Sequence, residues 1–253
     1  MTRLYIRIWI AIFVYMSVDL GRNVPLQIQR QLRKECFFGC ALCGSPLLKY
    51  AHIVPYNRIQ AFLPENMISL CPTHYGKYDS GDLSESYLRD AKKDPHNKLH
   101  PQDAFFVESQ DLVINVGKSK FINTHRILVV DDFDLITIAR DNGKYFLLDI
   151  NFFDKINNLI ATVIENSFVS ENSIGWNINY TPQKYLAIQN PQRNITFEIT
   201  IENTELYITA MMYYNNYSIR VTRNEILLDE NEIGTEFKNS VLKNYDVAIV
   251  AYT

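Results

Sequence analysis

Two pairs of metal-ligand residues with the same spacing constrain this chain of 253 residues more than any other feature. Two residues separate Cys40 from Cys43, and two residues also separate Cys71 from His74. Thiolates and imidazole nitrogens bind Zn²⁺ in a tetrahedron, and a turn between close cysteines brings both sulfurs to one ion. Four protein ligands leave no open coordination position. The spacing therefore predicts a structural zinc ion that holds a small folded unit together.

The cysteines are confined to one short region. All four lie between residues 36 and 71, which favours metal binding over a disulfide framework and is typical of a reducing compartment. We therefore expect a cytoplasmic protein. The fourth cysteine, Cys36, precedes the Gly39 turn, and its spacing to Cys40 suits a metal knuckle less well. We interpret Cys36 as a thiol of the core.

The segments around these ligands have the pattern of a β-hairpin followed by a helix. Strands are predicted over 47–53 and 67–70, and a helix over 72–79 has Pro72 in its first turn. Helices are also predicted over 25–35, and over 84–93 with Ser84 as the N-cap. The fold expected here is a zinc-stapled ββα unit.

From about Phe105 the hydrophobic pattern changes to short β-type runs between polar turns. The Asn-Gly pair within 141–144 is a strong hairpin signal, because both residues tolerate positive φ. The runs lie at 111–116, 126–130, 135–138, 144–148, 158–164, 176–180, 194–201 and 206–209. Strands recurring this often indicate a sandwich, a barrel or a β-solenoid. We therefore assign the chain to the α+β class.

Charge and hydropathy divide the chain into three predicted segments: 1–22, 23–103 and 104–253. Residues 1–104 carry 13 Lys and Arg against 9 Asp and Glu, a net charge of +4, whereas residues 105–253 carry 12 against 19, a net charge of −7. The first part thus suits a polyanion better than the second. The apolar run at 4–15 is too short for a stable membrane span. An upstream start codon with translation from Met16, a docked helix and a secretion signal remain as interpretations of it.

Two polar residues between the ligand pairs carry a resemblance to a known family. His52 lies in Tyr-Ala-His-Ile-Val-Pro (50–55), and Asn66 lies in Glu-Asn-Met-Ile-Ser-Leu-Cys (65–71), before the second ligand pair. With the Phe-Gly-Cys-Ala-Leu-Cys-Gly knuckle at 38–44, these motifs resemble the HNH endonucleases, also called ββα-metal or His-Me finger nucleases. The resemblance covers about residues 25–95 and leaves 105–253 unexplained.

The resemblance implies a metal-dependent endonuclease that hydrolyses phosphodiester bonds in DNA. His52 would be the general base that activates water, and Asn66 would brace the loop that orients it. A Mg²⁺ or Mn²⁺ ion, distinct from the zinc, would neutralise the phosphate. The family commonly places ligands of that ion where this chain has Ala51 and Tyr75. Asp79, one helical turn beyond Tyr75, is the replacement that we consider first, ahead of Glu65.

These departures leave an alternative open, in which a catalytically lapsed zinc module binds nucleic acid or protein. In a third interpretation, the β-rich part is the effector or scaffold and the zinc unit only staples the N-terminal half. Phosphate contacts are expected from Lys77, with Arg58 and Lys49 as further candidates, and ordinary surface charge is the competing interpretation. A homo-oligomer or a protein partner is considered for the β-rich segment.

Overall fold

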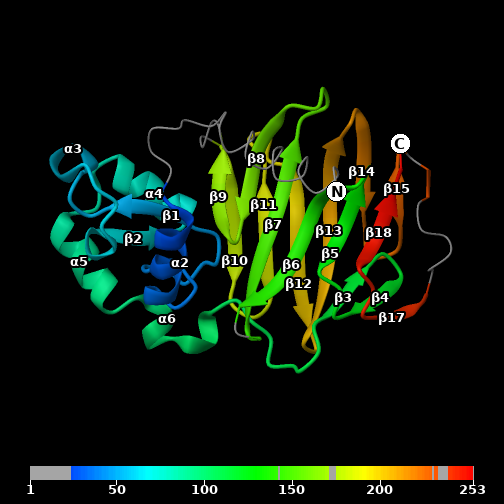
Figure 1. Cartoon of the computed structure of the whole chain (residues 1–253), viewed down its shortest axis with the longest axis horizontal. Coiled ribbons are helices and arrows are strands. Elements are labelled where there is room, and N and C mark those ends of the chain that lie inside the picture. Colours follow the sequence, from blue (N-terminus) through cyan, green and yellow to red (C-terminus); the bar gives the residue numbers. More distant parts are fainter. Residues whose placement is uncertain (1–23, 142, 171–174, 230, 233–238, 253) are drawn as a thin grey trace, which may run out of the picture.

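The computed structural model describes residues 24–252 except 142, 171–174, 230 and 233–238. The interpretations of the apolar segment 1–22 therefore lie outside the described residues. Within the described ranges, no helix combines the length and the apolar character needed to cross a membrane. The chain is of mixed α+β type, with a small helical region at the N-terminal end and strands in the rest (Figure 1).

The N-terminal region holds short helices around one β-hairpin (Figure 1, blue to green-cyan). Strands β1 (Lys49–His52) and β2 (Met67–Leu70) pair antiparallel, with Lys49 opposite Leu70 and His52 opposite Met67. The remaining elements are α2 (Leu26–Glu35), α3 (Tyr56–Ile59), η1 (Pro64–Asn66), α4 (Pro72–Asp79), α5 (Glu85–Lys93), α6 (His96–Leu99) and η2 (Pro101–Asp103). The predicted β-hairpin followed by a helix is thus present, with α4 at its predicted bounds.

Local chemistry accounts for the helix limits. Pro72 occupies the first turn of α4, where its missing N–H leaves no intrahelical hydrogen bond unmade. The Ser84 hydroxyl accepts a hydrogen bond from the Tyr87 N–H at 3.2 Å, so the predicted cap at the start of α5 is formed. Leu88 on α5 packs into a core with Ala51, Ile53 and the metal-ligand cysteines of this region.

The larger region consists of two β-sheets. The first has six strands in the order β18-β5-β6-β7-β8-β9, and the second has ten strands. The six-stranded sheet is formed by β5 (Arg126–Val130), β6 (Phe133–Asp141), β7 (Tyr145–Phe153), β8 (Leu159–Ile164), β9 (Ser167–Ser170) and β18 (Val247–Ala251). The ten-stranded sheet is formed by β3 (Val113–Val116), β4 (Ser119–Ile122), β10 (Asn177–Thr181), β11 (Tyr185–Gln189), β12 (Ile195–Glu202), β13 (Glu205–Tyr214), β14 (Tyr217–Val221), β15 (Ile226–Leu228), β16 (Asn231–Glu232) and β17 (Val241–Lys243).

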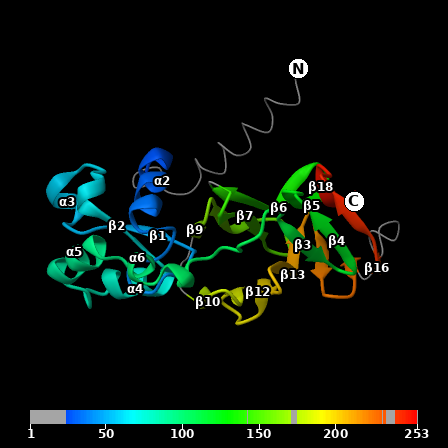
Figure 2. The same ribbon diagram turned by 90° about the horizontal axis from the view of Figure 1, so that it is seen from below.

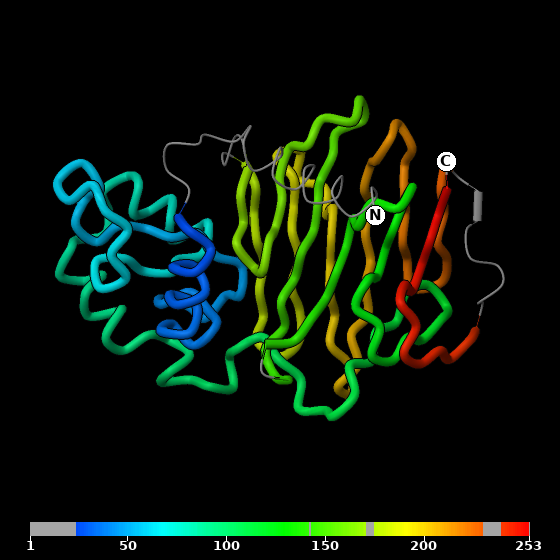
Figure 3. The backbone as a smooth tube through the Cα atoms, viewed as in Figure 1, coloured from blue at the N-terminus to red at the C-terminus, as the bar shows by residue number. Residues whose placement is uncertain are grey.

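The two sheets pack face to face as layers (Figures 2 and 3). One continuous core contains inward side chains of both sheets, such as Phe146 and Leu148 from β7 and Leu206 and Ile208 from β13. In β7 and β13, buried and half-buried residues alternate, which is the burial pattern of strands with one face on a core. Among the described strands, neither sheet closes into a barrel. Of the three architectures that the sequence left open, the structure therefore has the layered one.

Tight hairpins connect many of these strands. Asp131 and Asp132 join β5 to β6 with φ of 49° and 64°, and Asn215 and Asn216 join β13 to β14 with φ of 52° and 68°. Two central residues with positive φ match the right-handed twist of the flanking strands. The hairpin predicted at 141–144 is confirmed by the pairing of Asp141 with Tyr145, and Gly143 has a φ of 69°.

The N-terminal region is joined to the sheets through main-chain and charged contacts. The Leu48 N–H donates to the Asn166 carbonyl and the Leu48 carbonyl accepts from the Phe168 N–H, both at 2.8 Å, so the chain leading into β1 also pairs with β9. Leu47 belongs to the core of the sheets. Arg33 on α2 is 2% exposed and forms an ion pair with Glu165 in the β8–β9 turn. These contacts fix the N-terminal region against one end of the sandwich, whereas a division into separate domains at residue 103 stays a prediction.

Replacement of Arg33 tests this junction. Arg33→Ala leaves the half-buried Glu165 without its enclosed partner, so we expect a loss of about 3 kcal/mol in the free energy of unfolding. Arg30 contacts the same carboxylate, but its side chain is 52% exposed, so Arg30→Ala should cost less than about 1 kcal/mol. Urea denaturation of both variants measures the difference, and equal losses would contradict the role assigned to the buried contact.

Candidate metal centre and histidine site

Cys40, Cys43, Cys71 and His74 form one cluster. Their ligand atoms all lie within 4.8 Å of one another. The two sulfurs of Cys43 and Cys71 are 3.8 Å apart, and the His74 Nδ1 lies 3.5 Å from the Cys40 sulfur and 3.3 Å from the Cys71 sulfur. The predicted four-residue group is therefore assembled in space.

These distances fit a tetrahedral zinc ion. Zn–S and Zn–N bonds of ordinary length require about 3.8 Å between two sulfurs and about 3.5 Å between sulfur and nitrogen. A disulfide would need sulfurs about 2.05 Å apart, and all four cysteines are free thiols. The cluster can hold a metal ion, and its donor set is that of structural zinc. Cys36 is fully buried but lies outside the cluster, as expected for a core thiol.

The first ligand pair is held in a tight turn that leaves no room for a side chain at position 44. The Gly44 N–H donates to the Cys40 carbonyl at 2.9 Å, and the Cys40 N–H donates to the Ser45 carbonyl at 2.8 Å. A Cβ on Gly44 would lie 2.3 Å from the Asn97 side chain, and Gly44 has a φ of +74°. Asn97 is buried and donates to the Phe37 carbonyl at 3.0 Å. The turn thus depends on glycine at position 44 and on an asparagine from α6.

The second ligand pair stands at the beginning of α4. The Cys71 carbonyl accepts the Tyr75 N–H at 2.8 Å, which starts the helix. Hydrogen bonds from the Cys40 and Cys43 thiols, with the backbone N–H groups of His74 and Thr73, lower the pKa of Cys71. Burial instead raises the pKa of Cys40. One thiolate is therefore already favoured, and a metal ion would supply the positive charge that the other sulfurs need for ionisation.

His52 ends β1 and lies inside a small aromatic group. Its ring centroid is 5.1 Å from that of Tyr56 and 5.4 Å from that of Phe62. The imidazole pKa is lowered by burial, which outweighs a hydrogen bond to the backbone of Ala61. Its Nε2 is buried and has no hydrogen-bond partner in the described structure. An unpaired buried nitrogen of this kind is a position where water or a ligand group is expected.

Asn66 clamps the loop that follows His52. Its side-chain oxygen accepts the Val54 N–H at 2.9 Å, and its side-chain nitrogen donates to the Val54 carbonyl at 3.0 Å. The Asn66 carbonyl also accepts the Ile53 N–H at 2.8 Å. The asparagine is 5% exposed, so these bonds are shielded from water. Asn66 thereby fixes both ends of the loop in which the His52 ring is enclosed.

The positions expected to bind a second metal ion do not form a group of ligands. Ala51 is buried in the core, and the Tyr75 ring lies 5.0 Å from the Lys49 ammonium and 5.7 Å from the Tyr78 ring. Asp79 is exposed at the end of α4, and Glu65 is exposed on η1. Within the described ranges, the zinc-type cluster is the one group of three or more His, Cys, Asp or Glu side chains placed to hold a metal. The residues present therefore do not fit a Mg²⁺ or Mn²⁺ site.

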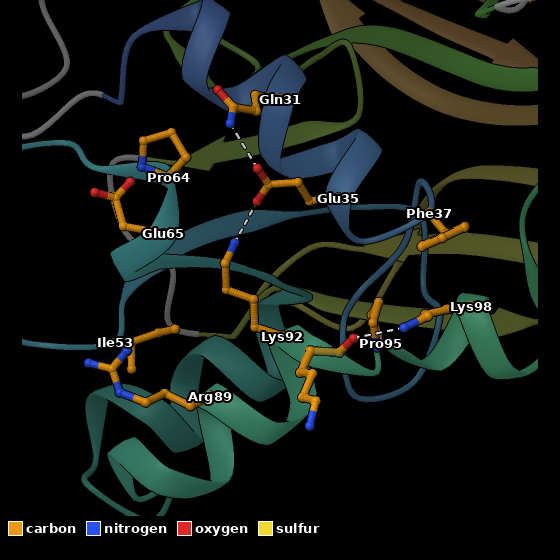
Figure 4. A pocket seen from close by; sticks show the side chains of 11 residues that line it. Gln31, Glu35, Phe37, Ile53, Pro64, Glu65, Arg89, Lys92, Pro95 and Lys98 are labelled. Carbon is orange, nitrogen blue, oxygen red and sulfur yellow. Dashed lines mark hydrogen bonds and ion pairs between the residues drawn. The ribbon is translucent and has the colours of Figure 1, made fainter.

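The basic residues singled out from the sequence belong to three different elements, β1, α3 and α4. Lys49 is half-buried against Tyr75, and burial lowers its pKa. Arg58 is exposed on α3 and pairs with Glu85 at 3.5 Å, and Lys77 is exposed on α4. A pocket beside the loop after His52 holds a different basic group on α5 and α6, which sequence reasoning missed (Figure 4). The signal was the spacing of Arg89, Lys92 and Lys93, which places all three on one helix face.

Comparisons with protein-family models, with curated proteins and with solved structures find no match for this chain. The site is therefore interpreted from its own geometry and from the motifs of the sequence.

Replacing one ligand tests the metal centre. In the Cys43→Ala variant, the amount of bound zinc should fall below one ion per chain. Thermal stability should also fall, because structural zinc contributes on the order of 10 kcal/mol to the folding of small modules. Cys36→Ala is the matched control, since it removes a buried thiol outside the cluster and should retain zinc. Elemental analysis with differential scanning calorimetry measures both. Unchanged zinc content in Cys43→Ala would contradict the ligand set.

Proposed function

We propose that the zinc-binding region is an HNH-type endonuclease module that hydrolyses phosphodiester bonds in DNA, with His52 as the general base. The observation that carries this proposal is the environment of His52. The ring is hydrogen-bonded to the Ala61 backbone, and Nε2 has no hydrogen-bond partner among the described residues. A base needs a fixed ring with one nitrogen available for a proton. The resemblance of the surrounding motifs to HNH nucleases supplies the substrate class.

The lowered pKa of His52 supports this role. Burial disfavours the imidazolium ion, so the ring is neutral near pH 7 and able to accept a proton from water. In the proposed reaction, water attacks the phosphorus atom and passes a proton to Nε2 while the bond to the leaving oxygen breaks. Nε2 is enclosed in the structure, so the reaction requires side chains around the ring to move and admit the water.

Asn66 acts as a positioning residue in this proposal. Its two side-chain bonds to Val54 and its main-chain bond to Ile53 hold the loop that begins directly after His52. The zinc cluster supports the site less directly, because it would tie the Cys40–Cys43 turn to the start of α4 beside the hairpin. The thiol ligands also suit a reducing, cytoplasmic setting.

The resemblance alone proposes Mg²⁺ or Mn²⁺ as a catalytic ion. Such an ion would neutralise charge on the phosphate. Because Ala51 and Tyr75 supply no carboxylate or imidazole, we assign no step of the reaction to it. These same two residues favour a second candidate function, in which the module has lost catalysis and binds nucleic acid without cleaving it.

His52→Ala tests the proposed base. We expect cleavage of plasmid DNA to fall by about 10²- to 10⁴-fold, the usual contribution of a general base. His100→Ala is the control, because His100 is exposed and distant in the sequence from the hairpin. In the unsubstituted protein, activity should decline only below about pH 6.5, the ordinary imidazole pKa, because burial lowers the pKa of His52. Full cleavage by His52→Ala would refute the assignment.

Tyr75→His separates the nuclease from its lapsed alternative. If the natural protein binds DNA but does not cleave it, restoring an imidazole at position 75 should produce Mg²⁺- or Mn²⁺-dependent nicking. Tyr75→Phe is the matched control, because it keeps the half-buried ring and adds no metal ligand. Cleavage by the natural protein that Tyr75→His leaves unchanged would exclude the lapsed-site interpretation.

A further inference from the structure

A pocket of about 680 Å³ lies between α2, α5 and α6, beside the loop that follows His52 (Figure 4). Ile53, the residue after His52, lines it, and so do Pro64 and Glu65, the two residues before Asn66. The loop clamped by Asn66 therefore forms one wall. A molecule bound in this pocket would contact the same loop that encloses the His52 ring.

The pocket carries an excess of positive charge. Arg89, Lys92, Lys93 and Lys98 line it, with the two carboxylates Glu35 and Glu65, and Lys98 forms an ion pair at 2.9 Å with Asp94. Figure 4 shows Glu35 held between the Gln31 amide, at 2.8 Å, and the Lys92 ammonium, at 2.6 Å.

Two of these cations remain available. Among the residues that the structure describes, no carboxylate forms an ion pair with Arg89 or Lys93, and both side chains are exposed. Such unneutralised cations on one helix face attract phosphate groups.

Phe37 adds an aromatic surface to the same pocket. The side chain is 40% exposed, whereas the adjacent Phe38 is buried and stacks on Tyr145 with ring centroids 4.2 Å apart. Both phenylalanines have positive φ, 52° and 59°, which is unfavourable for bulky residues. Strained backbone of this kind concentrates at functional sites. Here it sends one ring into the core and leaves the other at the pocket.

We propose that this pocket binds an extended single strand of nucleic acid, with backbone phosphates at Arg89 and Lys93 and a base stacked on Phe37. Aromatic rings beside cations are the recurring combination in proteins that bind single strands. Free phosphate would use only the cations, so the exposed ring favours a nucleotide chain. The binding site stands on its own contacts, and only its role in guiding a strand toward His52 rests on the proposed function.

Binding is measured by the fluorescence anisotropy of a short labelled single-stranded DNA, in the His52→Ala background and without added divalent ions, so that cleavage does not interfere. Arg89→Ala combined with Lys93→Ala should weaken binding and reduce the slope of log affinity against log salt by about 1.4, since each phosphate contact to a single strand contributes about 0.7. Phe37→Ala should weaken binding by about 5- to 100-fold, whereas Phe37→Tyr, which keeps an aromatic ring, should bind as the protein with Phe37 does.

Lys118→Ala combined with Lys184→Ala is the matched control, because it removes two exposed lysines from the β-rich region. Circular dichroism and zinc content check that each variant is folded. Equal weakening by the control pair would overturn the pocket assignment, and so would unchanged binding by the Arg89 and Lys93 variant. The stacked strand would be overturned if the Arg89 and Lys93 variant lost affinity, Phe37→Ala kept it, and inorganic phosphate displaced the labelled DNA as strongly as unlabelled DNA does.

The two proposals fail separately. Retained binding in the pocket variants, with cleavage that depends on His52, would reject the pocket and keep the nuclease. Binding that depends on Arg89, Lys93 and Phe37 in a protein that cleaves nothing would keep the pocket and reject the nuclease.

Discussion

The convergence of three sulfurs and one imidazole nitrogen is the interaction on which the N-terminal region depends. The hairpin there has two strands of four residues each, and a two-stranded hairpin of this size is at best marginally stable in water. The core of this region is also small, and the ligand cysteines themselves make up part of it. A metal ion bound by this cluster would join the 40–43 turn to the first turn of α4 and would supply stabilisation that the hairpin and the small core lack. The position of β1, and of His52 at its end, follows from that join.

The sandwich provides a second support. Leu47 lies in the core of the sheets while Leu48 pairs with β9, so the segment that leads into the hairpin is anchored by both regions. Tyr50 contacts Ser167 through its hydroxyl at 2.9 Å, and Ser167 donates to the side chain of Gln29 on α2 at 2.8 Å. The Cys/His cluster and the sheets therefore both support the Lys49 end of β1, because Cys71 follows Leu70, the partner of Lys49, and Leu48 pairs with β9. This arrangement gives the β-rich region a structural role whatever further partner it has.

The pKa of His52, the fixed loop around it and the positive charge near it come from different parts of the structure. Burial lowers the pKa of the ring, and a hydrogen bond to the Ala61 backbone restrains its orientation. The loop around it is fixed by Asn66, which exchanges two hydrogen bonds with a single backbone residue. Positive charge near the loop comes from lysine and arginine side chains on α5 and α6, and the described residues offer no second ligand group that would hold a metal ion there. If the module is a nuclease, its phosphate must be neutralised by these groups or by an ion bound largely through the substrate.

Much of the local structure was determined by the sequence alone. The ligand spacing predicted the metal cluster, Pro72 and Ser84 predicted two helix starts, and short β-type runs predicted about half of the described strands of the sandwich, because these signals act over a few neighbouring residues. Tertiary structure decided what no local pattern contains. It paired Arg33 with a carboxylate 132 residues away and brought Phe37 to the same pocket as Arg89. Those contacts join segments distant in the sequence, and their formation depends on how the helices, the hairpin and the sheets pack around shared cores.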